Sequence, residues 1–120
     1  MKRSMDLCRE ILLNLEAQPF GSGVIEVKIR DNTELEVSYH LMLLDQAGLV
    51  EAENLSKSTQ KMRWRAKYIT WAGHEFLEAS RNQTIWDRAK GTMAEKSVGM
   101  SFDIVKTILI KYGTEALIGK

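Results

Sequence analysis

A helix in the middle of the chain constrains the fold most, because both its start and its end are marked. Thr33 and Glu36 have the spacing of a capping box, in which each side chain bonds the backbone N–H of the other residue. Gly48, which follows Ala47, suits the left-handed position just past a helix end. We therefore expect a helix that begins at Asn32 or Thr33, ends at Ala47 and reverses at Gly48. Its inner apolar stripe is Val37, Leu41 and Leu44, and a second apolar row is Leu35, Tyr39 and Met42.

Two strand-like segments follow this helix. Residues 49–53 form the first, and residues 63–69 form the second, in which side chains of different polarity alternate. A polar connection over residues 54–62 separates them. One face of the second strand is expected to hold Trp64, Ala66 and Tyr68, and the other face Arg63, Arg65 and Lys67. A helix followed by a hairpin is the order of a helix and its wing, so we expect an α+β fold, specifically a winged-helix variant.

Further elements are expected before this segment. A first helix runs from Ser4 to about Gln18, because apolar residues repeat at helical spacing and Pro19 stops the helix. Its buried face is Cys8, Ile11, Leu12 and Leu15. A strand is expected from Val24 to Arg30, where apolar and charged residues alternate strictly.

Helices are expected after the hairpin. Thr70 caps one, a kink is expected at residues 82–84, and a short helical segment continues to about Lys90. Ser101 caps a last helix. We expect residues 1–120 to form a single winged-helix-like domain with a C-terminal helical extension from about residue 82.

The composition indicates a cytoplasmic protein. A single cysteine cannot form an internal disulfide, which is typical of a reducing compartment. The N-terminus does not resemble a signal peptide, and the apolar runs are too short to span a bilayer, so no membrane partner is expected. The net charge of +1 is low for a non-specific DNA binder, so local clusters of charge matter more than the sum.

Residues for metal binding or catalysis are sparse. The histidines are His40 and His74, and neither they nor Cys8 have the spacing of a structural metal site. Cys8 lies near a helix N-terminus, which lowers a thiol pKa, but it also lies on the apolar stripe, which favours an inert core thiol. No nucleophile or phosphate-loop motif occurs. We expect no metal, no cofactor and no enzymatic activity.

The hairpin carries the clearest charge pattern. Between Asn54 and Lys67 there are basic residues and no acid. The basic residues are Lys57, Lys61, Arg63, Arg65 and Lys67. Such a stretch is typical of phosphate binding by displacement of counterions. Equally, charge on a hairpin edge protects it from pairing with other strands, and both interpretations stay open.

The preceding helix favours a different conclusion. From Glu34 to Glu53 there are five acidic residues and no Lys or Arg. The side chains this region offers to base edges are chiefly Ser38, His40 and Gln46. Acid against phosphate is repulsive, so insertion of this helix into the major groove is unfavourable. If double-stranded DNA is bound, we expect the basic hairpin to make the contact.

The last helix has a wide apolar face. This face and Trp86 predict either a homodimer interface or a buried intramolecular core. The residues concerned are Trp86, Phe102, Val105, Ile108, Leu109 and Tyr112. The sequence thus supports two functions: nucleic-acid binding through the wing, or a protein–protein interaction or dimerisation module without DNA binding.

Several sequence blocks, in order along nearly the whole chain, are similar to those of one family. They are MKRSMDL at residues 1–7, ILL at 11–13, YHL at 39–41, AGL at 47–49, ITWAGHEFL at 69–77, TIW at 84–86 and SFDI at 101–104. On these blocks the chain resembles the small bacterial and prophage proteins called domain of unknown function 2513. The resemblance implies a winged-helix variant without an assigned activity. Ile69, where leucine is more usual, is a conservative departure.

Overall fold

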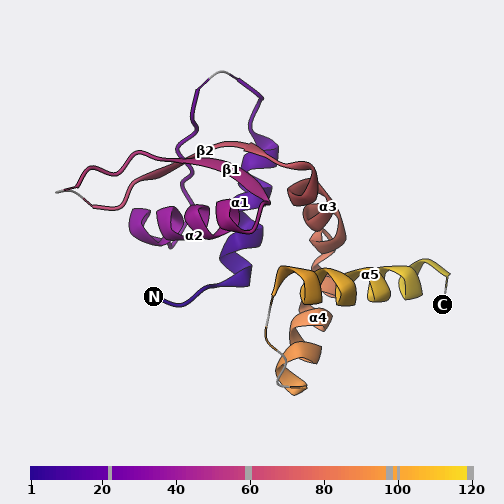
Figure 1. The fold of residues 1–120 in the computed structure, drawn as a ribbon. Helices are drawn as coiled ribbons and strands as arrows, with labels where there is room; N and C mark the ends of the chain where they lie inside the picture. The colour runs from indigo at the N-terminus through magenta and orange to yellow at the C-terminus, as the bar shows by residue number, and fades with distance from the viewer. Residues whose placement is uncertain (22, 59–60, 97–98, 100, 119–120) are drawn as a thin grey trace. The chain divides into compact units, whose positions relative to one another are not determined.

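The computed structural model describes residues 1–21, 23–58, 61–96, 99 and 101–118. In chain order its elements are α1 (Met5–Ala17), α2 (Glu34–Gln46), β1 (Val50–Asn54), β2 (Trp64–Ile69), α3 (Trp71–Ser80), α4 (Gln83–Glu95) and α5 (Phe102–Ile118) (Figure 1). The expected α+β fold with a β-hairpin after a helix is confirmed. The chain divides into two compact units, residues 1–74 and 75–120, and the division lies within α3, ahead of residue 82, where we expected the helical extension to begin.

α1 forms where its sequence predicts a helix. Ser4 is the N-cap, and its side-chain oxygen accepts the Leu7 backbone N–H at 3.1 Å. The helix ends at Ala17, because Pro19 disfavours a helical conformation in the residue before it. All members of the predicted apolar stripe are buried: Cys8, Ile11, Leu12 and Leu15. α1 packs against α2 and β2 within the first unit.

α2 begins and ends at the predicted signals. The Thr33 hydroxyl accepts the Glu36 N–H at 3.0 Å, and Glu36 Oε1 accepts the Thr33 N–H at 2.8 Å, so the capping box is present. Gly48 has a φ of 80°, and the Leu49 N–H donates to the Leu44 carbonyl oxygen at 3.0 Å, as in a Schellman motif. The inner stripe is buried, whereas the second row is only partly covered: Leu35 is exposed, and Tyr39 and Met42 are half-buried.

The hairpin contains an irregularity that its sequence does not reveal. β1 and β2 pair antiparallel, with Glu51 opposite Tyr68 and Ala52 opposite Ala66. Lys67 is therefore an extra residue on β2, as in a β-bulge. The bulge interrupts the strict alternation, so that Lys67 and Tyr68 are consecutive exposed residues. The expectation that Tyr68 shares the environment of the buried Ala66 is wrong for this reason.

The strand expected from Val24 to Arg30 is wrong. Only Ile25 forms a bridge, exchanging two backbone hydrogen bonds with Ala66 at 2.7 and 3.0 Å. In an antiparallel ladder, the next exchanged pair of bonds would use the backbone of Trp64. The Trp64 N–H instead donates to the Ser38 hydroxyl of α2 at 3.0 Å. The ladder stops after one bridge because this side chain has taken the donor.

Aromatic contacts hold the second unit together. Phe76 on α3 meets Trp86 on α4 and Phe102 on α5 edge to face, with ring centroids 6.3 and 5.1 Å apart. The expected kink at residues 82–84 is a break between two helices, and the Asn82 side chain caps the second by accepting the Ile85 N–H at 2.9 Å. α4 then continues past Lys90, where the predicted segment ended.

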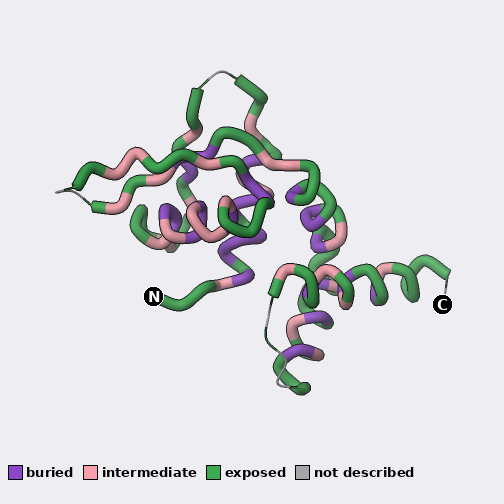
Figure 2. Tube along the Cα trace, in the orientation of Figure 1, coloured by how far each residue is buried: buried purple, intermediate pink, exposed green. Residues whose placement is uncertain are grey.

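The last helix follows its predicted cap. Ser101 accepts the Ile104 N–H at 3.2 Å, and α5 packs on α4. Within the described ranges, no helix combines the length and the apolar character that crossing a bilayer requires. Figure 2 shows that α1 is largely buried, whereas most of the hairpin is exposed or half-buried.

Candidate nucleic-acid interface

The wing, defined as residues 50–69, carries cations at its surface. Four of its predicted basic residues are exposed. They are Lys57, Lys61, Arg63 and Lys67. Among the residues that the structure describes, none of the four has a carboxylate within ion-pair distance. Their charge is therefore available to a partner.

Backbone hydrogen bonds hold the wing in shape beyond the ends of its strands. The Leu55 N–H donates to the Arg63 carbonyl oxygen at 2.8 Å, and the Arg63 N–H donates to the Ser56 hydroxyl at 2.7 Å. Figure 1 shows the paired segments extending past α2 within the first unit. Arg63 thus has a fixed backbone and an exposed guanidinium. The predicted connection of residues 54–62 includes residues 59 and 60, which lie outside the described residues.

Arg65, the fifth predicted phosphate contact, has a different role. Its side chain is 9% exposed, and its Nη2 lies 3.4 Å from Glu26 Oε2 and 3.1 Å from Glu34 Oε2. Its Nη1 donates to the Trp64 carbonyl oxygen at 3.0 Å. Arg65 therefore joins β2 to the segment before α2 and to the start of α2. This placement removes it from the cations that can reach a phosphate, because its charge is already compensated.

All three acidic residues of α2 have partners within the fold. Glu34 pairs with Arg65, Glu36 belongs to the capping box, and Asp45 Oδ1 accepts the Ala52 N–H at 3.0 Å. Exposed carboxylates remain on β1, at Glu51 and Glu53. α2 consequently repels phosphate less than its composition suggests.

The polar residues that α2 offers to base edges are mostly inaccessible. Ser38 is buried and holds the Trp64 N–H, and His40 is buried at 2% exposure. Of the three residues considered, Gln46 alone is exposed. Recognition of bases by α2 therefore has little support, and the wing remains the better contact surface.

His40 and Cys8 are structural in this fold. His40 Nε2 accepts the Ser4 N–H at 2.8 Å, while its Nδ1 lies 2.8 Å from the Glu36 carbonyl oxygen. These partners require a neutral ring with the proton on Nδ1. Burial raises the pKa of the Cys8 thiol to about 12, partly opposed by Arg3, so its thiolate is disfavoured. Among the described residues, no group of His, Cys, Asp and Glu has the arrangement of a metal site.

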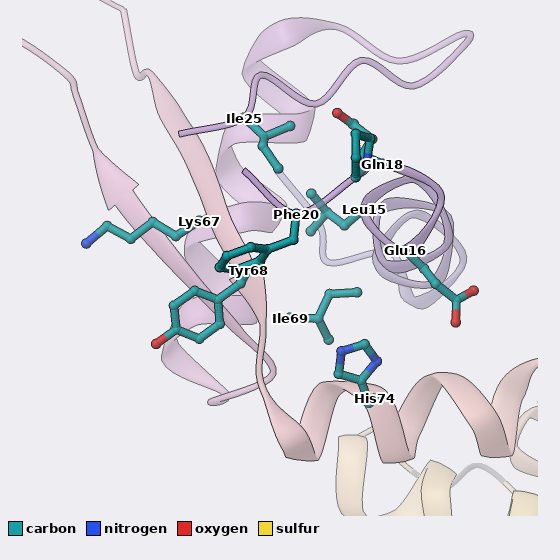
Figure 3. A pocket seen from close by; sticks show the side chains of 10 residues that line it. Leu15, Glu16, Gln18, Phe20, Ile25, Lys67, Tyr68, Ile69 and His74 are labelled. Carbon is teal, nitrogen blue, oxygen red and sulfur yellow. The ribbon is translucent and has the colours of Figure 1, made fainter. Parts of the chain in front are cut away.

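A pocket of about 270 Å³ lies beside the base of the wing, between the end of α1, β2 and the first turn of α3 (Figure 3). Its apolar lining includes Leu15, Ile25 and Ile69. Phe20 and Tyr68 add exposed aromatic rings, and Glu16, Lys67 and His74 add polar groups. Sequence reasoning missed this site. The signal present in the sequence was an aromatic residue, Phe20, between Pro19 and Gly21.

The six residues predicted for a dimer interface lie mostly inside the second unit. Trp86, Val105, Leu109 and Tyr112 are buried, and Phe102 and Ile108 are half-buried. Arg88 stacks on the Tyr112 ring at 3.8 Å from its centroid, and Thr92 Oγ1 lies 2.6 Å from the Tyr112 hydroxyl. These contacts match the intramolecular alternative. The homodimer itself stays a prediction.

Sequence comparisons show which known proteins this chain is similar to. A family model described as "Hypothetical protein (DUF2513)" matches residues 2–99. A protein of Haemophilus influenzae named "Uncharacterized protein" is 42% identical over 109 residues, which cover 90% of this chain and 92% of the relative. No solved structure matches significantly. The chain therefore belongs to the DUF2513 family, and the family name assigns no activity.

Proposed function

We propose that this protein binds nucleic acid, including double-stranded DNA, through the phosphate contacts of its wing, and that it is not an enzyme. The observation that carries the proposal is a set of four exposed wing cations that have no ion-pair partner among the described residues. They lie on a hairpin whose backbone is held by its own hydrogen bonds. A DNA partner implies a cytoplasmic location, which is part of the proposal.

Phosphate contacts fit the chemistry of the wing better than base recognition does. Lys and Arg side chains bind phosphate oxygens and release condensed counterions, without reading sequence. α2 exposes no Lys or Arg, and Ser38 and His40 are buried within the fold. We therefore expect binding with little sequence preference and a strong dependence on salt.

A salt titration tests the proposal. Fluorescence anisotropy with random-sequence duplex DNA should show binding that weakens as salt rises, with a log–log slope of about −0.9 per phosphate, or about −3.6 if four cations engage. The double substitution Lys57→Glu with Arg63→Glu should abolish binding. Lys111→Glu, an exposed cation on α5, is the matched control and should change little.

Two outcomes would overturn the proposal. One is the absence of binding at low salt, and the other is unchanged affinity after the double substitution in the wing. Circular dichroism on each variant separates loss of binding from loss of folding, because exposed charge changes usually alter stability by less than about 0.5 kcal/mol.

The alternative function is a protein–protein interaction or dimerisation module without DNA binding. The observation that favours it is exposed apolar surface on α5, where Ile110 is 50% and Leu117 is 85% exposed. Light scattering at high micromolar concentration should report a dimer of this chain. A monomer at that concentration, with Ile110→Glu behaving like the unsubstituted chain, would contradict the dimer.

A further inference from the structure

We propose that the pocket beside the wing binds an unpaired nucleobase, so that the preferred ligand is a single strand, or a duplex with an unpaired base. The proposal rests on the proposed function for the neighbouring phosphate contacts. The inference goes beyond the proposed function because it assigns a second contact, to the base, to residues outside the predicted basic set. Phe20 and Tyr68 carry this inference for the base, and Lys67 of the basic set lines the same pocket.

The aromatic rings of the pocket are exposed without an evident structural cause. Phe20 is 88% exposed and Tyr68 is 48% exposed, although both line the same cavity. Figure 3 shows both side chains among those that line the pocket, together with Ile25 and Ile69. Aromatic side chains that face solvent are the usual stacking partners of unpaired bases, since every base has a π-face. Burial of one base would cover surface that the fold leaves open.

The size of the pocket limits what it can hold. At about 270 Å³ it is below the range of roughly 300–1,000 Å³ typical of sites for drug-sized ligands. A single flat ring system fits this limit better than a helix or an extended peptide. Its apolar wall of Leu15, Ile25 and Ile69 suits the face of a base, and the His74 imidazole can donate or accept a hydrogen bond at a base edge.

Charge distinguishes a nucleotide from an uncharged aromatic ligand. The β-bulge makes Lys67 and Tyr68 consecutive exposed residues, and both line the pocket. A nucleotide has the complementary arrangement, with a phosphate next to its base. In Figure 3 the Glu16 carboxylate points away from Lys67, which leaves the Lys67 side for the phosphate. Lys67 also belongs to the wing, so the strand that enters the pocket continues along the other wing cations.

The test compares three ligands of equal length under the same salt: oligothymidylate, the same oligomer made abasic, and a random duplex. We expect oligothymidylate to bind about tenfold more tightly than the abasic strand, because both offer the same phosphates and only one offers bases. Phe20→Ala or Tyr68→Ala should reduce oligothymidylate binding to the abasic level and leave abasic binding unchanged. Tyr68→Trp, which keeps an aromatic ring at this position, should retain the tighter binding of oligothymidylate.

The matched control is Trp71→Ala, because Trp71 is 79% exposed but does not line the pocket. It should leave binding of all three ligands unchanged. Equal affinity for oligothymidylate and the abasic strand, with both lost in the Lys57→Glu, Arg63→Glu variant, would overturn the base site and uphold the wing. No binding of any ligand at low salt would overturn both.

Discussion

α2 and the wing are charged in opposite senses, and the fold uses the two sets of charges differently. On α2, Glu34 pairs with Arg65, and Glu36 and Asp45 hold backbone N–H groups. On the wing, the exposed cations have no such partner within the described residues. Charges that hold the fold together contribute to stability, and charges that remain unpaired are free to bind. Counting charges along the sequence cannot make this distinction.

The largest expected effect is on stability, at the contact between the start of α3 and the residues that link α2 to β1. The Thr70 hydroxyl donates to the Gly48 carbonyl oxygen at 2.6 Å, and Gly73 packs directly on the Leu49 backbone. A methyl group at residue 73 would overlap the Leu49 carbonyl oxygen and contact Ile69 at 2.6 Å. Gly73→Ala should lower the free energy of unfolding by about 3 kcal/mol, the upper part of the usual range for overpacking.

Denaturant unfolding followed by circular dichroism measures this effect. Gly91→Ala on α4 is the control, because a methyl group there meets no atom within 4 Å. It should raise the stability by about 1 kcal/mol, the difference in helix propensity. Similar losses in both variants would show that the backbone contact of Gly73 is not the cause.

Two neighbouring arginines test the comparison most directly. Arg65→Ala should lower the free energy of unfolding by about 2 kcal/mol, less than a fully buried pair, because Glu26 and Glu34 are 45% and 61% exposed. Arg63→Ala should change stability by less than about 0.5 kcal/mol and weaken nucleic-acid binding. Chemical denaturation measures the stability of both variants, and fluorescence anisotropy measures their affinity for nucleic acid. The reverse pattern, with Arg63 stabilising and Arg65 binding, would break the comparison.

The sequence predicted those parts of the fold that depend on residues close together in the chain. The caps at Ser4 and Thr33 and the reversal at Gly48 are local signals, and all three are confirmed. The strand at residues 24–30 was wrong because its partner's donor is taken by Ser38, a residue on another element. Alternation indicates that a segment can be a strand, but it does not supply a free edge.

The candidate site shows the same limit. The basic character of the wing could be predicted, whereas the burial of Arg65 depends on Glu26 and Glu34, which are distant in the chain. The bulge at Lys67 changes which side chains face solvent, and it has no signal in the alternating sequence. For that reason the pocket next to Tyr68 emerges only in three dimensions.

Cys8 provides a smaller effect and a probe of the packed part of the first unit. Burial raises its pKa from 9.0 to about 12. Between these two pH values the folded chain keeps the thiol proton, whereas the unfolded chain loses it. This contribution to stability is complete below pH 9 and decreases as the pH rises from 9 towards 12. At pH 10 the loss is about 1.4 kcal/mol relative to pH 8. Unfolding free energies of the unsubstituted chain and Cys8→Ala, measured at both pH values, should differ in their pH dependence by this amount.

The smallest effect separates stability from binding at the start of α2. Thr33→Ala removes the hydroxyl that accepts the Glu36 N–H, and should lower the free energy of unfolding by about 1 kcal/mol. Thr114→Ala on the exposed surface of α5 is the control, and should leave stability unchanged or slightly raised. Neither substitution touches an unpaired wing cation, so anisotropy should report the same affinity for nucleic acid in both. A Thr33→Ala variant that stays folded but loses binding would place part of the binding surface on α2, because only then would a cap on that helix affect the ligand.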